Sequence, residues 1–159
     1  MGDAMSPDTG RRAPALLAEY ARGRAIALAA HATLELIERP TVAPVPGMAY
    51  YAHGLIHWQG RHVPAIDLHT LLRAHADEPP PPPRFALVLA WQRAPGLPLE
   101  HGALGLAGLP QRIEVADEPP CPLPTDSDLW PLIANSCMRW HGRVLPIIDT
   151  TRLFCAAHG

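Results

Sequence analysis

The sequence predicts a mainly β protein made of two similar small units. Twenty prolines divide the 159 residues into short pieces, and most pieces alternate apolar residues with small or polar ones, as short strands do. The phrase WQGRHVPAID at residues 58–67 recurs as WHGRVLPIID at residues 140–149, with six of ten positions identical. A chain of this length is one ordinary domain, or two very small ones fused around a shared core.

The N-terminal region is expected to be a tail followed by a strand. Residues 1–14 are polar and lack a hydrophobic stretch, so we expect a disordered tail and no signal peptide. Residues 25–37 place apolar side chains on even positions from Ile26 to Leu36. This period of two predicts one strand with a buried face.

Prolines predict the next two connections. Three of them in residues 39–47 indicate an extended connector. The five consecutive prolines of residues 79–83 favour a polyproline II spacer about 15 Å long, with a ligand for an SH3 or WW domain as the alternative reading. Residues 85–91, FALVLAW, are apolar throughout, which is typical of a strand buried on both faces.

The repeat extends beyond the ten-residue phrase. Two more blocks occur in the same order, and a short helix or turn is expected after each copy of the phrase. We therefore divide a domain at residues 15–157 into halves at about 24–75 and 84–156, with a proline-rich linker at 77–84. The additional matched blocks are 25–29 with 103–107, and 34–36 with 113–115.

The phrase itself predicts a β-hairpin. A two-residue turn at Gln59 and Gly60 needs the positive φ that glycine adopts easily. In that register Trp58 faces Arg61 across the ladder, where a guanidinium on an indole face contributes about 0.5–1 kcal/mol. The corresponding residues of the second copy are Trp140, His141, Gly142 and Arg143.

The end of the phrase is expected to be structural as well. Pro64 and Pro146 cannot donate a ladder hydrogen bond, so each is expected at an edge or a bulge. Asp67 and Asp149 end their strands, and we interpret both as caps of the following turn or helix. Four apolar side chains should then fold back onto the core: Leu71, Leu72, Leu153 and Phe154.

Composition and cysteine number exclude several classes of function. The formal charge of −2 gives no reason to expect nucleic acid as a partner, and no apolar run reaches the length needed for membrane insertion. The absence of lysine excludes a Walker-type phosphate loop. Three cysteines without C-x-x-C spacing read as free thiols of a reducing, cytoplasmic compartment.

The histidines raise the question of a metal site. His57 and His62 become cross-strand neighbours in the predicted hairpin, and two imidazoles fill two corners of a tetrahedral site. No spacing specifies a third ligand from His53, His69 or an acidic residue, so we expect no metal and no cofactor. A small metal-dependent hydrolase that uses His53, His57 and His62 is the alternative from the enzyme class.

Nucleophilic catalysis also lacks a recognisable motif. The three serines lie outside any Gly-x-Ser-x-Gly turn, and no glycine-rich phosphate loop occurs. The sequence thus favours a binding surface over an enzyme. Within the repeated hairpin, the positions that differ between the copies are the candidates for function: His57, Gln59 and His62 against Arg139, His141 and Val144.

The stretch GLIHWQGRHVPAIDLHTLL, residues 54–72, resembles the signature of CheW-like adaptor domains, Gly-Val-Ile-Asn-Leu-Arg-Gly-x-x-x-Pro-Val-x-Asp-Leu-Arg. Residues 33–36 are similar to the family's Val-x-Glu-Ile, and the resemblance extends over about residues 24–156. It implies two intertwined SH3-like five-stranded β-barrels that share a core. It also implies a non-catalytic adaptor.

The resemblance implies partners too. CheW-like proteins couple the cytoplasmic tips of chemoreceptors to the regulatory domain of a CheA-type histidine kinase, in arrays that control flagellar or pilus-driven motility, and contacts with other CheW-like proteins are an additional expectation. A divergent accessory adaptor in a twitching or surface-motility system fits this sequence. A double-barrel module that binds another regulator is the alternative.

Carried over by position, the resemblance implies a set of protein-interaction residues. Gln59 stands where the family has arginine, and His57 and Trp58 replace Asn-Leu, while residues 15–21 are helix-like in composition where the family has a strand. The receptor-facing candidates are Thr33, Glu35, Gly54, Gln59, Gly60, Gly105 and Ser136. The hairpin residues His57, Trp58 and Arg61 complete the set.

Overall fold

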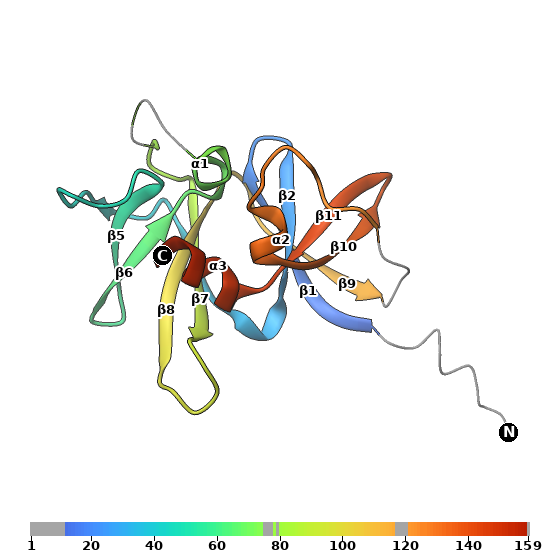
Figure 1. The fold of residues 1–159 in the computed structure, drawn as a ribbon. Helices are drawn as coiled ribbons and strands as arrows, with labels where there is room; N and C mark the ends of the chain where they lie inside the picture. The colour runs from blue at the N-terminus through green and yellow to red at the C-terminus, as the bar shows by residue number, and fades with distance from the viewer. Residues whose placement is uncertain (1–11, 75–77, 79, 117–120, 159) are drawn as a thin grey trace, which may run out of the picture.

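A computed structural model describes residues 12–74, 78, 80–116 and 121–158 (Figure 1). The strands are β1 (Arg12–Ala21), β2 (Arg24–Ala29), β3 (Thr33–Glu38), β4 (Val42–Ala43), β5 (Ala52–Trp58), β6 (Arg61–Ile66), β7 (Phe85–Gln92), β8 (Leu99–Leu106), β9 (Gln111–Ala116), β10 (Ala134–Trp140) and β11 (Arg143–Ile148). The helices are α1 (Leu68–Arg73), α2 (Trp130–Ile133) and α3 (Thr150–His158), and a 3-10 turn spans Ala30–Ala32.

The strands form two sheets with the same topology. One sheet has the order β10-β11-β2-β1-β9, and the other has the order β3-β7-β8-β6-β5-β4 (Figure 1). Read from its other end, the second sheet has the order β4-β5-β6-β8-β7-β3. Without the additional strand β4, this order corresponds strand by strand to β10-β11-β2-β1-β9. Each sheet therefore takes strands from both halves of the sequence, which confirms the mainly β class and the intertwined arrangement.

The exchange of strands changes the expected boundaries. The predicted halves at about 24–75 and 84–156 are not separate bodies, because β2 joins one sheet whereas β3, β5 and β6 join the other. The repeat also begins earlier than expected, because β1 is the counterpart of β7. The predicted tail is too long: residues 1–11 lie outside the described residues, but Arg12 already pairs with Ala116 of β9.

Strand registers correct the alignment of the first additional block. Ala27 pairs with Ile147 in one sheet, and Ala103 pairs with Ala65 in the other. Since Ile147 and Ala65 hold the same place in the repeated phrase, Ala27 corresponds to Ala103. The predicted match of 25–29 with 103–107 is two residues out of register. An even slip keeps every side chain on its face, so an alternating pattern does not reveal it.

The second block is also misaligned. Ile37 pairs with Ala86 of β7, and Ile113 pairs with Ala15 of β1. The registers of β7 with β8 and of β1 with β2 make these two isoleucines equivalent. The correct match is 36–38 with 112–114, and the predicted match of 34–36 with 113–115 is wrong.

The single strand predicted over residues 25–37 is two strands. The 3-10 turn at Ala30–Ala32 separates β2 from β3, and the Thr33 hydroxyl donates to the Ala30 carbonyl at 2.7 Å. The chain crosses from one sheet to the other at this point. Leu34, expected on the buried face, is 46% exposed.

Two apolar clusters show how β7 packs within and between the sheets. Along β7, Leu87 and Leu89 lie in a large core between the two sheets, whereas Ala86 and Val88 lie in a small cluster within their own sheet. Both faces of β7 are thus buried, as predicted. Small side chains suit the inside of a narrow barrel. Along β7, the two leucines fill the shared core.

Both hairpins have the predicted geometry. Gln59 and Gly60 have φ of 48° and 74°, and His141 and Gly142 have 49° and 78°. Trp58 pairs with Arg61, and Trp140 pairs with Arg143. Pro64 and Pro146 each lie just before the residues that start a parallel ladder, where their strands have a partner on one side. Neither proline lies on an edge strand, because β6 lies between β8 and β5 and β11 lies between β2 and β10, so the edge prediction holds only for the unpaired side of these two residues.

The two aspartates begin the helices that follow the hairpins. Asp149 Oδ1 accepts from the Arg152 amide at 3.0 Å, so it caps α3 with its side chain. Asp67 occupies the N-cap position of α1, but its carboxylate accepts from the Thr70 hydroxyl at 2.5 Å and not from a backbone amide. The four expected apolar side chains, Leu71, Leu72, Leu153 and Phe154, are all buried.

Replacing Asp149 by alanine should lower the free energy of unfolding by about 1 kcal/mol, because it removes the cap of α3. Urea unfolding followed by circular dichroism measures this change. Asp128→Ala, at an exposed carboxylate outside any helix, is the control and should have a smaller effect. Equal losses for both variants would show that the cap does not contribute.

The expectation that all three cysteines are free thiols is wrong. Cys121 and Cys137 form a disulfide with a Cα–Cα distance of 5.7 Å, and Cys155 is the free cysteine among the described residues. The pairing joins the segment before α2 to β10. Because the two residues lie 16 positions apart without a motif, sequence spacing alone could not identify the pair.

Candidate functional site

The first hairpin positions a tryptophan against the opposite end of its own sheet. Trp58, at the end of β5, is only 8% exposed. Its indole Nε1 donates to Oε1 of Glu35 at 3.0 Å. Glu35 lies on β3, the first strand in the sheet order, whereas β5 is next to last. The contact therefore requires the sheet to curl onto itself, which agrees with the shared cluster of Ile37 and Ile56.

His101 of β8 completes this arrangement. Its ring centroid lies 5.2 Å from that of Trp58, and its Nδ1 lies 3.2 Å from Nη1 of Arg61. Arg61 thus contacts His101, where we expected it to lie on the indole. Burial, and secondarily the Arg61 charge, lower the pKa of His101. The neutral imidazole can then accept a hydrogen bond from the guanidinium.

We refer to Glu35, Trp58, Arg61 and His101 as the hairpin cluster. The structure gathers most of the predicted interaction residues around it, because Thr33 lies two residues before Glu35 and the exposed Gln59-Gly60 turn lies between Trp58 and Arg61. His57 is exposed on the other face of the same hairpin. Sequence reasoning missed His101, since it lies outside the repeated phrase and only the β6–β8 pairing brings it close.

The remaining candidates lie elsewhere. Gly54 is buried under β4, and a Cβ there would come within 2.5 Å of the Ala43 carbonyl oxygen. Its φ of 139° also favours glycine. Gly105 is buried beneath His53 and Pro83. Ser136, the counterpart of Gly54 at the bulge of β10, is exposed on the other sheet.

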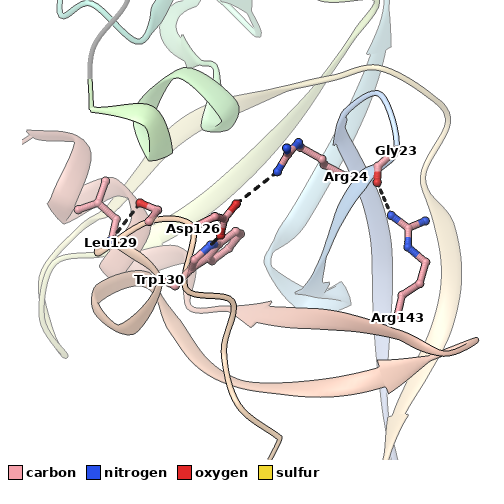
Figure 2. Close-up of polar contacts among 7 residues, drawn as sticks. Gly23, Arg24, Asp126, Leu129, Trp130 and Arg143 are labelled. Carbon is pink, nitrogen blue, oxygen red and sulfur yellow. Dashed lines mark hydrogen bonds and ion pairs between the residues drawn. The ribbon is translucent and has the colours of Figure 1, made fainter.

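The second hairpin uses its equivalent residues differently (Figure 2). Arg143 donates to the carbonyl of Gly23, in the turn between β1 and β2. Beside it, Asp126 accepts from the Trp130 indole at 2.8 Å and lies 3.3 Å from Arg24. This network fixes the β1–β2 turn and the segment before α2. The hairpin cluster is therefore a feature of the first copy of the repeat.

A pocket of about 380 Å³ lies beside the first copy. His53, Asp67, His69, Gly105 and residues 81–83 contribute to its wall. The pKa of His53 is lowered mainly by burial, which outweighs the opposing effects of Asp67 and of a hydrogen bond to the Pro81 backbone. Its Nδ1 is buried without a hydrogen-bond partner among the described residues.

Burial of His53 predicts a pH-dependent stability. The unfolded chain takes up a proton near the ordinary pKa of 6.5, whereas the folded protein keeps His53 neutral to lower pH. The contribution of neutral, buried His53 to the free energy of unfolding is fully present above pH 6.5 and should be lost as the pH falls below that value. Urea unfolding at pH 7.5 and pH 5.0 measures the loss, which His53→Gln should reduce.

His31→Gln, at an exposed histidine, is the matched control and should keep the slope of the wild type. If His53→Gln and wild type lost stability in parallel between the two pH values, His53 would not be the source.

The three histidines of the hydrolase alternative, His53, His57 and His62, do not meet at one point. His53 and His57 are separated along β5 by about 13 Å, given a rise of about 3.3 Å per residue. In the part of the chain that the structure describes, no group of three or more His, Cys, Asp or Glu residues is arranged to hold a metal. The three-histidine hydrolase centre considered above therefore does not form.

Within the described ranges, no helix has the length and apolar character needed to cross a bilayer.

Comparison with known proteins agrees with this architecture. A family model described as the CheW-like domain matches residues 16–101. The solved structure of the scaffolding protein TtCheW from Thermoanaerobacter tengcongensis is similar, with a TM-score of 0.65 and 15% sequence identity over 87% of this chain and 90% of that chain. At this identity the likeness concerns the fold. No curated protein matches the sequence.

Proposed function

The chain belongs to the CheW-like domain family, and from this membership we propose that it is a non-catalytic scaffold in a chemosensory signalling complex. The observation that carries the proposal is the family match over residues 16–101, which extends from β1 into β8. In this proposal the protein couples a chemoreceptor tip to the regulatory domain of a CheA-type histidine kinase. It acts in the cytoplasm, in a flagellar or a pilus-driven system.

We propose that the receptor tip contacts the hairpin cluster and the adjacent turn. Three observations support this surface. Glu35 and Arg61 offer opposite charges at exposed positions. Trp58 is held by one hydrogen bond and one ring contact, so the surface is ordered before a partner arrives. The turn residues Gln59 and Gly60 lie beside it and are exposed.

Gln59 favours an accessory role for this scaffold. It also supports a second candidate function, in which the protein binds another signalling regulator. A neutral amide cannot form the bidentate ion pair that an arginine makes with a carboxylate. A scaffold with this turn would bind a receptor weakly, or would bind another signalling regulator through the same surface.

Replacing Gln59 by arginine should strengthen binding to the receptor tip by about tenfold, equivalent to about 1.4 kcal/mol. Gln59 is exposed and already adopts φ of 48°, so the substitution adds a charged donor without new packing. His141→Arg makes the same change in the equivalent turn of the second copy and should leave affinity unchanged. Identical affinities for wild type and Gln59→Arg would mean that the turn does not contact the receptor.

Isothermal titration calorimetry with purified components tests the proposed function. We expect micromolar binding to the regulatory domain of the kinase encoded by the same genome, and separate binding to a receptor tip. Binding to neither component would contradict the scaffold proposal. Binding to a different regulator alone would favour the second candidate.

A further inference from the structure

Two histidines face each other on the outer side of the first hairpin. His57 of β5 and His62 of β6 are directly paired across the antiparallel ladder, and both side chains are exposed. The pair that flanks a two-residue turn exchanges backbone hydrogen bonds, so the next pair along the ladder does not. His57 and His62 form that next pair, in which side chains approach most closely.

The repeated sequence indicates that this pair is not required by the architecture. The second hairpin has the same turn geometry and the same pairing of Trp140 with Arg143. At the positions of His57 and His62 it has Arg139 and Val144, which are also paired. A hairpin of this fold therefore forms without histidines at these two positions.

The spacing of the two rings fits a shared metal ion. Their centroids lie 5.5 Å apart, with an angle of 67° between the ring planes. Two imidazoles bound to one zinc ion at about 2.0–2.1 Å, with a tetrahedral N–Zn–N angle, have centroids about 5 Å apart. Small side-chain rotations would bring one nitrogen of each ring to the ion without any change in the backbone.

We propose that His57 and His62 form an open two-histidine site for a late first-row divalent metal ion such as zinc. Imidazole nitrogen favours Zn²⁺, Ni²⁺ and Cu²⁺ over Mg²⁺ and Ca²⁺. Among the described residues no third ligand joins the pair, so water fills the remaining positions in the isolated protein. The exposed site lies on the hairpin that carries the turn Gln59-Gly60, where a partner side chain can replace a water molecule.

The test uses the full chain without a histidine tag and requires neither kinase nor receptor, so its failure is separate from that of the proposed function. Zinc chloride should raise Tm in a saturable manner, by about 5 °C when free zinc exceeds Kd about a hundredfold. Magnesium chloride should have no effect. In NMR spectra, zinc should shift the ring signals of His57 and His62 before those of other histidines.

His57→Gln and His62→Gln should each abolish the rise in Tm. His141→Gln is the matched control, because Gln59 already occupies the equivalent turn position with almost the same φ, and it should retain the full rise. No rise in the wild type would overturn the proposal. A rise that persists in both His57→Gln and His62→Gln would also overturn it, because the ion would then bind elsewhere.

Discussion

Replacing Gly102 by valine should destabilise the protein by about 3 kcal/mol or more, which lowers Tm by about 6 °C or more in a chain of this size. Gly102 lies in β8, directly beneath the ring of Phe154 from α3, and any Cβ there would overlap that ring. Phe154 is 1% exposed, and its ring stacks on that of Trp91 with the two ring centroids 5.7 Å apart. It therefore has no free space into which it can move. Differential scanning calorimetry measures the change in Tm.

A second substitution identifies the cause. Phe154→Leu combined with Gly102→Ala should lose less stability than the sum of the two single changes, because the smaller side chain makes room for the added methyl group. Gly108→Ala is the control, since the nearest atom to its added Cβ is the carboxylate end of Glu19, a flexible side chain. Additive losses would show that the contact between α3 and β8 is not the source.

Replacing Glu35 by arginine should weaken binding to the receptor tip by at least about tenfold, with little loss of folded structure. Glu35 is exposed and is the acceptor for the Trp58 indole. The substitution removes that acceptor and reverses the charge at this position of the hairpin cluster. Glu35→Gln keeps an acceptor oxygen for Trp58 and should have an intermediate effect. Calorimetric titration with the receptor tip gives the three affinities.

Glu38→Arg provides the control for charge. Glu38 is exposed on the same strand, three residues further along, so its side chain lies on the other face of β3. We expect its affinity for the receptor tip to equal that of the wild type. Equal losses of affinity for Glu35→Arg and Glu38→Arg would show that net charge is the cause. No loss of affinity for Glu35→Arg would show that the receptor does not contact the hairpin cluster.

The features that could be predicted from the sequence are local ones. A glycine in a two-residue turn fixes the hairpin and hence the pairs Trp58–Arg61 and His57–His62. The aspartate at each strand end marks the start of a helix, although only Asp149 accepts a hydrogen bond from a free backbone amide, whereas Asp67 accepts from the Thr70 hydroxyl. The continuous apolar run of residues 85–91 correctly predicts burial on both faces.

The exchange of strands between sheets could not be predicted from these patterns. An alternating segment is compatible with any sheet that buries one of its faces, so residues 25–37 read as one strand although a turn at Ala30–Ala32 sends the chain to the other sheet. His101 illustrates the same limit, because its contact with Arg61 depends on how distant strands are ordered. The disulfide of Cys121 with Cys137 likewise depends on tertiary packing.

Reconstitution tests most directly the proposed role, in which this protein links a receptor to a kinase. Receptor cytoplasmic domains attached to lipid vesicles are mixed with the CheA-type kinase, with or without this protein, and sedimented. We predict that the kinase sediments in an amount that increases with added protein and decreases when Glu35→Arg replaces the wild type. Kinase sedimentation that is unchanged by the wild-type protein at every concentration would contradict the account.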